Sequence, residues 1–117
     1  MYILIVEDDP FLAYDLCEAI TTLHADIRTA RSVRDAMSLF RDGMPLVAIL
    51  DFNLGSETSR DVAVRLAREN VPFCFVTADG DGVRDDPALT HCPVLTKPYR
   101  IEDVRAVAKE LLLAGGY

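Results

Sequence analysis

Three short runs in this chain are apolar at every position: YILIV at 2–6, LVAIL at 46–50 and PFCFV at 72–76. A strand with one face in water alternates apolar and polar residues, whereas a strand covered on both faces is apolar throughout. Helix-like patterns separate the three runs, so the chain alternates strand and helix. The sequence therefore predicts an α/β fold in which these runs form the centre of a parallel sheet with helices on both faces.

Four segments carry apolar residues at helical spacing, and their ends have recognisable signals. Asp9 followed by proline is typical of a helix start. Ser32 begins a capping-box-like sequence, and Gly43 is typical of a helix end. We expect helices at about 10–23, 32–43, 59–70 and 101–113.

Two further strands are predicted at the edges of the sheet. Segment 26–30 is weak and alternating, and segment 93–95 starts with a proline, which suits an edge position. Residues 78–92 contain two glycines, a proline and four aspartates. Glycine costs roughly 1 kcal/mol and proline about 3 kcal/mol inside a helix. We expect a loop there, with one turn begun by Asp86 and Pro87, so that the fourth helix is short or absent.

The strand order follows from the handedness of the connections. Crossovers between parallel strands are right-handed, and the apolar strands belong in the middle. The prediction is a single domain over residues 1–117, with a five-stranded parallel sheet in the flavodoxin-like order 2-1-3-4-5. In such a sheet the ligand crevice lies beyond the carboxyl ends of the strands, at the point where the strand order reverses.

Chemically active side chains follow the predicted strands: Glu7 and Asp8, Asp51, Thr77 and Lys97. Two carboxylates ~4 Å apart repel by about 4 kcal/mol at an effective dielectric near 20, so three together call for a cation. Oxygen ligands of this kind favour Mg²⁺. Asp51, alone at the end of a central strand, can attack phosphorus. A lysine ammonium and a threonine hydroxyl can neutralise the oxygens of a transferred phosphoryl group.

The motifs at these strand ends resemble those of response-regulator receiver domains, the CheY-like domains of bacterial two-component signalling. The matching stretches are V-E-D-D at 6–9, I-L-D-F-N at 49–53, V-T-A at 76–78 and T-K-P-Y at 96–99. Each motif is weak alone, but the four stand in the family's order and span the whole chain.

The resemblance implies roles for individual residues. Asp51 is similar to the phosphoacceptor. Asp8 is similar to the direct Mg²⁺ ligand, Glu7 to an acid that acts through water, and Asn53 to the residue whose backbone carbonyl binds the metal.

It also implies a phosphoryl-binding and switch group formed by Thr77, Ala78 and Lys97, and a cis peptide bond between Lys97 and Pro98. Asn53 and Asp79 are candidates for tuning hydrolysis of the phosphoryl group. For Asp79, ordinary loop polarity is an equal alternative.

The chain departs from the family pattern at three places. The family usually has a proline soon after the acceptor and then a glycine, whereas Gly55 and Ser59 stand nearby here. The switch aromatic three residues before the lysine is Val94. A shortened fourth helix and an N-L-G loop resemble a subgroup of stand-alone regulators.

The function that the resemblance implies is a stand-alone response regulator, not an enzyme. It would accept phosphate from a histidine kinase or phosphotransfer protein with Mg²⁺, and act by protein binding or as a phosphate sink. A pseudo-receiver that binds partners without phosphate remains an alternative. A second alternative is an aspartyl-phosphate phosphatase, although the second acid that such an enzyme needs is replaced by Asn53. A flavin-binding carrier of the same fold is disfavoured, because three acids after the first strand would repel the flavin phosphate.

The composition of the chain limits the classes of partner and the cellular compartment that we expect for it. The net charge of −7 argues against nucleic acid or an anionic membrane surface as a direct partner. The three cysteines are an odd number without metal-like spacing, typical of a reducing compartment. No apolar run approaches the ~18 residues that a membrane span needs. We expect a cytoplasmic protein.

Overall fold

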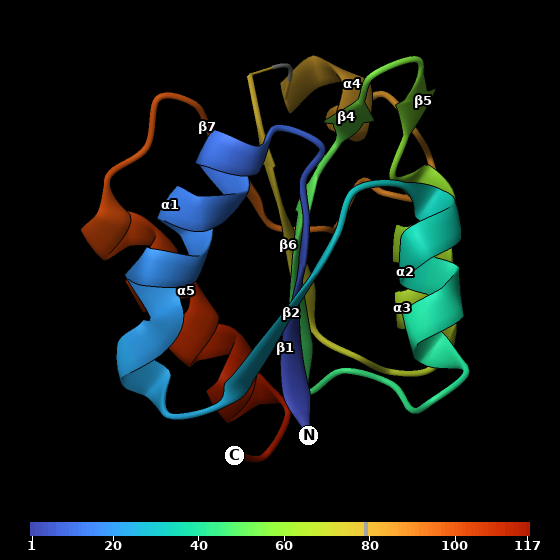
Figure 1. Ribbon diagram of the computed structural model, residues 1–117. Coiled ribbons are helices and arrows are strands. Elements are labelled where there is room, and N and C mark those ends of the chain that lie inside the picture. The colour runs from blue at the N-terminus through green and yellow to red at the C-terminus, as the bar shows by residue number, and fades with distance from the viewer. Residues whose placement is uncertain (79) are drawn as a thin grey trace.

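The computed structural model describes residues 1–78 and 80–117 and has a five-stranded parallel sheet at its centre (Figure 1). Every neighbouring pair of strands in this sheet is parallel. The predicted α/β fold and the predicted order 2-1-3-4-5 are confirmed. In spatial order the strands are β2 (Asp26–Ala30), β1 (Tyr2–Val6), β3 (Val47–Asp51), β6 (Phe73–Thr77) and β7 (Val94–Thr96).

Helices cover both faces of the sheet (Figure 1). Helix α1 (Pro10–Ile20) continues into the short 3₁₀ helix η1 (Thr21–Leu23) and packs with α5 (Ile101–Ala114) on one face. Helices α2 (Val33–Phe40) and α3 (Arg60–Arg68) lie side by side on the other face. No helix in the described part of the chain is long and apolar enough to cross a membrane.

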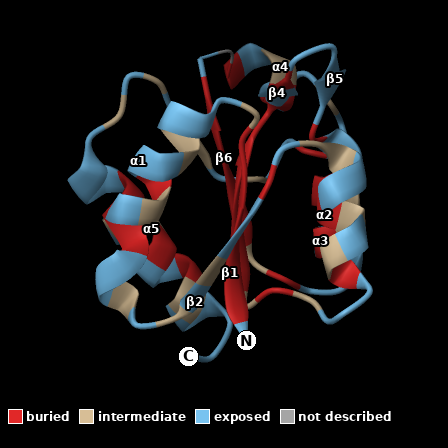
Figure 2. Cartoon of the chain, viewed as in Figure 1, coloured by how far each residue is buried: buried red, intermediate tan, exposed pale blue. Residues whose placement is uncertain are grey.

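The core is divided by the sheet into two apolar layers, and the three central strands, β1, β3 and β6, are buried along their whole length (Figure 2). Leu4, Leu50 and Phe75 point to the α2–α3 layer. Ile5 and Ile49, which pair across β1 and β3, point to the α1–α5 layer. Because each apolar run supplies both layers in alternation, the absence of polar residues within the runs is explained.

Side-chain caps fix two of the helix starts that the sequence predicts. The Asp9 carboxylate accepts hydrogen bonds from the backbone N–H groups of Phe11 (2.9 Å) and Leu12 (3.3 Å). The Ser32 hydroxyl accepts one from Asp35 N–H (3.1 Å). Each cap satisfies backbone donors that have no partner within the helix.

Strands β3, β6 and β7 each end one residue later than predicted, at Asp51, Thr77 and Thr96. Asp51 is the last residue of β3 and pairs with Val76, and Thr77 is the last residue of β6 and pairs with Thr96. The prediction stopped each strand at its last apolar residue. The hydrogen-bond ladder continues past that point because backbone pairing does not depend on side-chain polarity.

The region between β6 and β7 contains a helix of five residues, α4 (Gly80–Arg84). The expected turn at Asp86 is present as well, because Asp86 Oδ1 accepts from Ala88 N–H at 2.9 Å. The fourth helix is therefore short, as predicted, but it begins upstream of the expected turn.

A small antiparallel hairpin that the sequence did not predict follows β3. It consists of β4 (Asn53–Leu54) and β5 (Glu57–Thr58). Gly55, in the connecting turn, has a φ of +66°, which suits a residue without a Cβ. The Glu57 carboxylate accepts a hydrogen bond from Val33 N–H at 3.2 Å, which joins the hairpin to the start of α2.

Candidate functional site

Three carboxylates meet at the carboxyl ends of the two central neighbouring strands. Glu7 and Asp8 follow β1, and Asp51 ends β3, whose residue Leu50 pairs with Val6 of β1. One oxygen from each carboxylate lies within 4.8 Å of the other two. The cluster forms at the point where the strand order reverses, the place at which open α/β sheets bind ligands.

Burial makes this cluster electrostatically unfavourable on its own. Glu7 is 1% exposed and Asp51 6% exposed, while Asp8 is half-buried. Burial, followed by the negative charge of Asp51, raises the pKa of Glu7 from 4.5 to about 7. Without a bound cation, Glu7 therefore retains its proton well above the ordinary range of a glutamate.

Lys97 supplies positive charge to this cluster from the loop after β7. Its Nζ donates a hydrogen bond to Asp51 Oδ2 at 3.1 Å and lies 3.5 Å from Glu7 Oε1. Burial by itself lowers the pKa of Lys97, but the hydrogen bond and the charge of Asp51 outweigh burial and leave that pKa raised. The ammonium is therefore fully charged at neutral pH.

The atoms and the charge of the acidic cluster are those of a cation-binding site. Glu7 Oε1 is buried and has no hydrogen-bond partner among the described residues. Three carboxylates face one ammonium, so negative charge is in excess. Since the donors are all oxygens, the residues present fit a hard divalent cation such as Mg²⁺.

The residues predicted around the phosphoryl group lie at adjacent strand ends. Thr77 is fully buried, and its carbonyl accepts a hydrogen bond from Lys97 N–H at 2.9 Å. Ala78 follows it and is exposed. The Lys97–Pro98 peptide bond is cis. Asp79, a candidate for tuning hydrolysis, lies outside the described residues.

Asn53 is held beside the predicted acceptor by its backbone. Its N–H donates to Asp51 Oδ1 at 3.2 Å, and its side chain is exposed. This bond fixes one carboxylate oxygen of Asp51 while Lys97 fixes the other.

Sequence reasoning did not assign a site role to Gly55 or Tyr99. A Cβ on Gly55 would lie 3.7 Å from Asp8 Oδ2, so the hairpin turn closes over the acidic cluster. Burial raises the pKa of the Tyr99 phenol, with Lys97 opposing that effect. An open hollow of about 370 Å³ has Lys97 and Tyr99 in its lining, which leaves the lysine side of the site accessible. The glycine in the N-L-G turn was the available signal for Gly55, and the T-K-P-Y motif was the available signal for Tyr99.

Val94, at the predicted position of the switch aromatic, lies in β7. It pairs with Phe75 of β6 and is half-buried against the α2–α3 layer of the core. Its isopropyl group fills that position without the ring found in the family.

The fold that carries this site is similar to those of known proteins. No protein-family model matches the chain. The receiver domain of the response regulator PhyR from Erythrobacter litoralis, solved by NMR, is 26% identical, with a TM-score of 0.84. The match covers 96% of this chain and 89% of that one. The chain is a receiver-like domain.

A second similar structure is that of the response regulator TrrA from Thermotoga maritima in complex with Mg²⁺ and beryllofluoride. It is 23% identical, covers 95% of this chain and 98% of that one, and has a TM-score of 0.82, which shows the same fold. That receiver was solved with a cation, and this receiver-like domain carries a buried acidic cluster.

The probable transcriptional regulatory protein TcrX from Mycobacterium tuberculosis is 34% identical over 119 aligned positions. The match covers 97% of the receiver-like domain and 50% of TcrX, so the chain spans about half the length of the curated relative that it matches. The similar proteins are response regulators and receiver domains.

Proposed function

We propose that this receiver-like domain accepts a phosphoryl group on Asp51 in a two-component phosphorelay. The donor would be a sensor histidine kinase or a phosphotransfer protein. The observation that carries the proposal is the contact between Lys97 Nζ and Asp51 Oδ2 at 3.1 Å, within a cluster of buried acids. A nucleophile, a counter-charge and a cation-binding group lie together at the carboxyl ends of the strands.

The chemistry of the transfer follows from these groups. An Asp51 oxygen forms a bond to phosphorus while the P–N bond of a phosphohistidine breaks, and the departing imidazole nitrogen keeps the electron pair and takes up a proton. Lys97 neutralises one phosphoryl oxygen, and the Thr77 hydroxyl and Ala78 N–H donate to others. A Mg²⁺ ion held by Asp8, Asp51 and the Asn53 carbonyl, with Glu7 through water, would supply further positive charge.

The proposed role is acceptance of phosphate and not turnover of a substrate. An aspartyl phosphatase needs a second carboxyl group as general acid and base, and the residue two positions after Asp51 is Asn53, whose amide does not titrate. We infer that the domain signals by binding a protein partner or by draining phosphate from a relay, without contacting nucleic acid directly.

The proposal is tested by incubating the protein with acetyl phosphate and Mg²⁺ and recording its intact mass. A gain of one phosphoryl group is expected for the native protein and for the control Asp42→Asn, an exposed aspartate two residues after the end of α2. Asp51→Asn should show no gain. An unmodified native protein would favour the pseudo-receiver alternative, and an adduct on Asp51→Asn would place the acceptor elsewhere.

A further inference from the structure

A second hollow lies at the amino ends of the strands, whereas the acidic cluster lies at their carboxyl ends. It is beside the ends of η1 and α5. Its volume is about 460 Å³, within the range of small-molecule sites in proteins. Its lining comes from three parts of the chain: residues 23–25 after α1, Leu46 before β3, and the last turns of α5 with Tyr117. None of these residues belongs to the candidate phosphoryl site.

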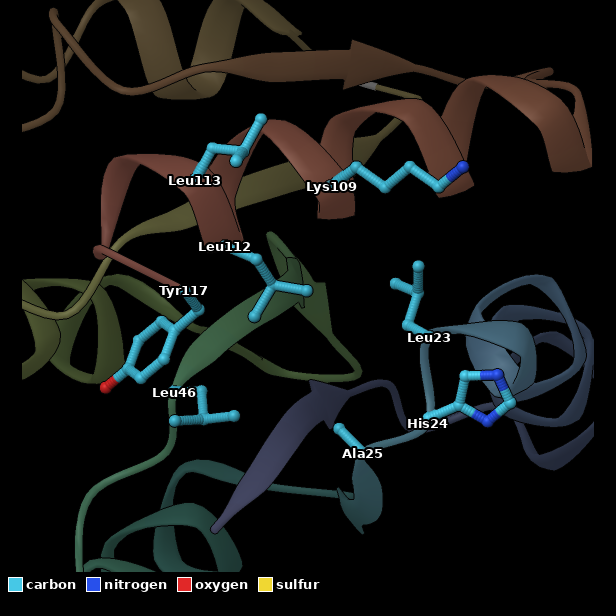
Figure 3. Close-up of a pocket in the computed structure, with 8 residues that line it drawn as sticks. All are labelled: Leu23, His24, Ala25, Leu46, Lys109, Leu112, Leu113 and Tyr117. Atoms are coloured by element: carbon cyan, nitrogen blue, oxygen red, sulfur yellow. The ribbon is translucent and has the colours of Figure 1, made fainter.

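Leucines make up half of the residues that line this hollow. Leu23 from η1, Leu46 before β3 and Leu112 from α5 surround one space (Figure 3). Leu23 and Leu112 are only partly buried and pack against the α1–α5 layer of the core. Leu113 extends the apolar surface outward and is 72% exposed. The core is therefore incompletely closed here, and its apolar surface continues to solvent.

Tyr117 forms a further wall because the backbone after α5 folds back. Tyr117 N–H donates to the Leu112 carbonyl at 2.9 Å, and Gly116 has a φ of +90°. A Cβ on Gly115 would lie 3.1 Å from the Tyr117 ring, so the glycine permits the close approach of that ring. The aromatic wall is thus held by hydrogen bonds and not by side-chain packing alone.

One ammonium accompanies this apolar lining. Lys109 and Lys97 are the two lysines of the chain, and Lys109 lines the hollow. It makes no ion pair or hydrogen bond with any described residue, although the chain carries a net charge of −7. His24, held in the left-handed region with a φ of 57°, stands at the same rim as Lys109 (Figure 3). No aspartate or glutamate side chain from the described residues is part of the lining.

We propose that this hollow binds a medium-chain fatty carboxylate. The alkyl tail lies against Leu23, Leu46 and Leu112, where burial of its methylene groups is favourable. The carboxylate pairs with the Lys109 ammonium at the rim. Charge complementarity selects this occupant, because a neutral or cationic amphiphile would leave Lys109 unpaired or would be repelled by it.

The test titrates the protein with octanoate and follows the methyl signals of its leucines and the ring signals of Tyr117 by NMR. Saturable shifts at Leu23, Leu46, Leu112 and Tyr117 in the millimolar range are expected for a ligand of this size. 1-Octanol and octylammonium, with the same tail and no negative charge, should bind more weakly. Equal binding of all three, or unsaturated shifts at exposed Phe11 and Tyr14, would overturn the proposal.

Two variants test whether octanoate binding depends on the charge of Lys109 or only on the net charge of the protein. Lys109→Gln should weaken octanoate binding about tenfold, the loss of one charge-assisted contact, and leave 1-octanol binding unchanged. Arg34→Gln makes the same change of net charge on α2, on the opposite face of the sheet, and should leave octanoate binding unaltered. An unchanged octanoate affinity in Lys109→Gln would exclude the proposed head-group contact. Because acetyl phosphate labelling of Asp51 is read separately, either proposal can fail alone.

Discussion

Lys97 Nζ lies 3.1 Å from Asp51 Oδ2, although the two residues are 46 positions apart in the chain. Asp51 is the last residue of β3, and Lys97 directly follows β7. Strand β6 lies between these two strands in the sheet. The contact is short because these strands are parallel, so that their carboxyl ends lie on the same side of the sheet. The phosphoryl chemistry proposed for the domain depends on this contact.

Lys97→Ala should slow phosphorylation of the protein by acetyl phosphate roughly a hundredfold, because a donor to the developing charge is lost. The rate is measured from the mass spectrum as a function of time. Lys109→Ala removes the other lysine of the chain and should react at the native rate. An unchanged rate in Lys97→Ala would separate the lysine from the chemistry.

Mg²⁺ should raise the thermal midpoint of unfolding, since a ligand that binds only the folded state adds about 2.7 kcal/mol of stability at one hundred times its dissociation constant. The rise should disappear on addition of a chelator and in Asp8→Asn. Asp9→Ala provides the comparison: it removes the α1 cap at a cost of about 1 kcal/mol but should retain the response to Mg²⁺. A full response in Asp8→Asn would contradict the assignment.

The stability of the metal-free protein should fall as pH rises between 4.5 and about 7 because of Glu7. The folded pKa of Glu7 is about 7 and its ordinary value is 4.5, so within this window the folded state binds more protons than the unfolded state. The contribution is fully present below pH 4.5 and is lost as pH rises through the folded pKa. Urea unfolding over this range should show a shallower decline in Glu7→Gln. Identical slopes in the two proteins would contradict the shifted pKa.

Gly55→Ala should destabilise the protein by about 1 kcal/mol, because an L-residue is strained at positive φ. The loss of stability comes from backbone strain and not from a steric clash, since the new Cβ would make an ordinary van der Waals contact with Asp8. Gly80→Ala is the matched change at a helical glycine, where only the flexible end of the Arg84 side chain must move, and should cost less. Urea unfolding of both variants gives the comparison; an equal loss would attribute the effect to volume.

The central part of the fold could be predicted because it depends on patterns that the sequence states directly. Unbroken apolar runs indicate strands with both faces covered, and the crossover rule then leaves few strand orders. The meeting of Glu7, Asp51 and Lys97 follows from that order, since each stands at the end of a parallel strand.

The remaining features depend on interactions that no local pattern contains. The β4–β5 hairpin has strands of two residues, too short for a hydrophobic period. Helix α4 forms at Gly80–Arg84 in spite of glycine, where burial of Val83 in the core offsets a weak propensity. The final strand residues Asp51 and Thr77 are polar, so pattern reading ends the strand before them.

Glu7, Asp8 and Asp9 are consecutive, and each has a separate task. The Glu7 carboxylate accepts a hydrogen bond from Asp9 N–H, and the Asp9 carboxylate in turn anchors the first turn of α1. Helix α1 presents Phe11 and Tyr14 to solvent. A partner that binds the Phe11 ring would therefore contact the helix start that lies three residues after Asp8, and its binding would be coupled to the position of the acidic pair.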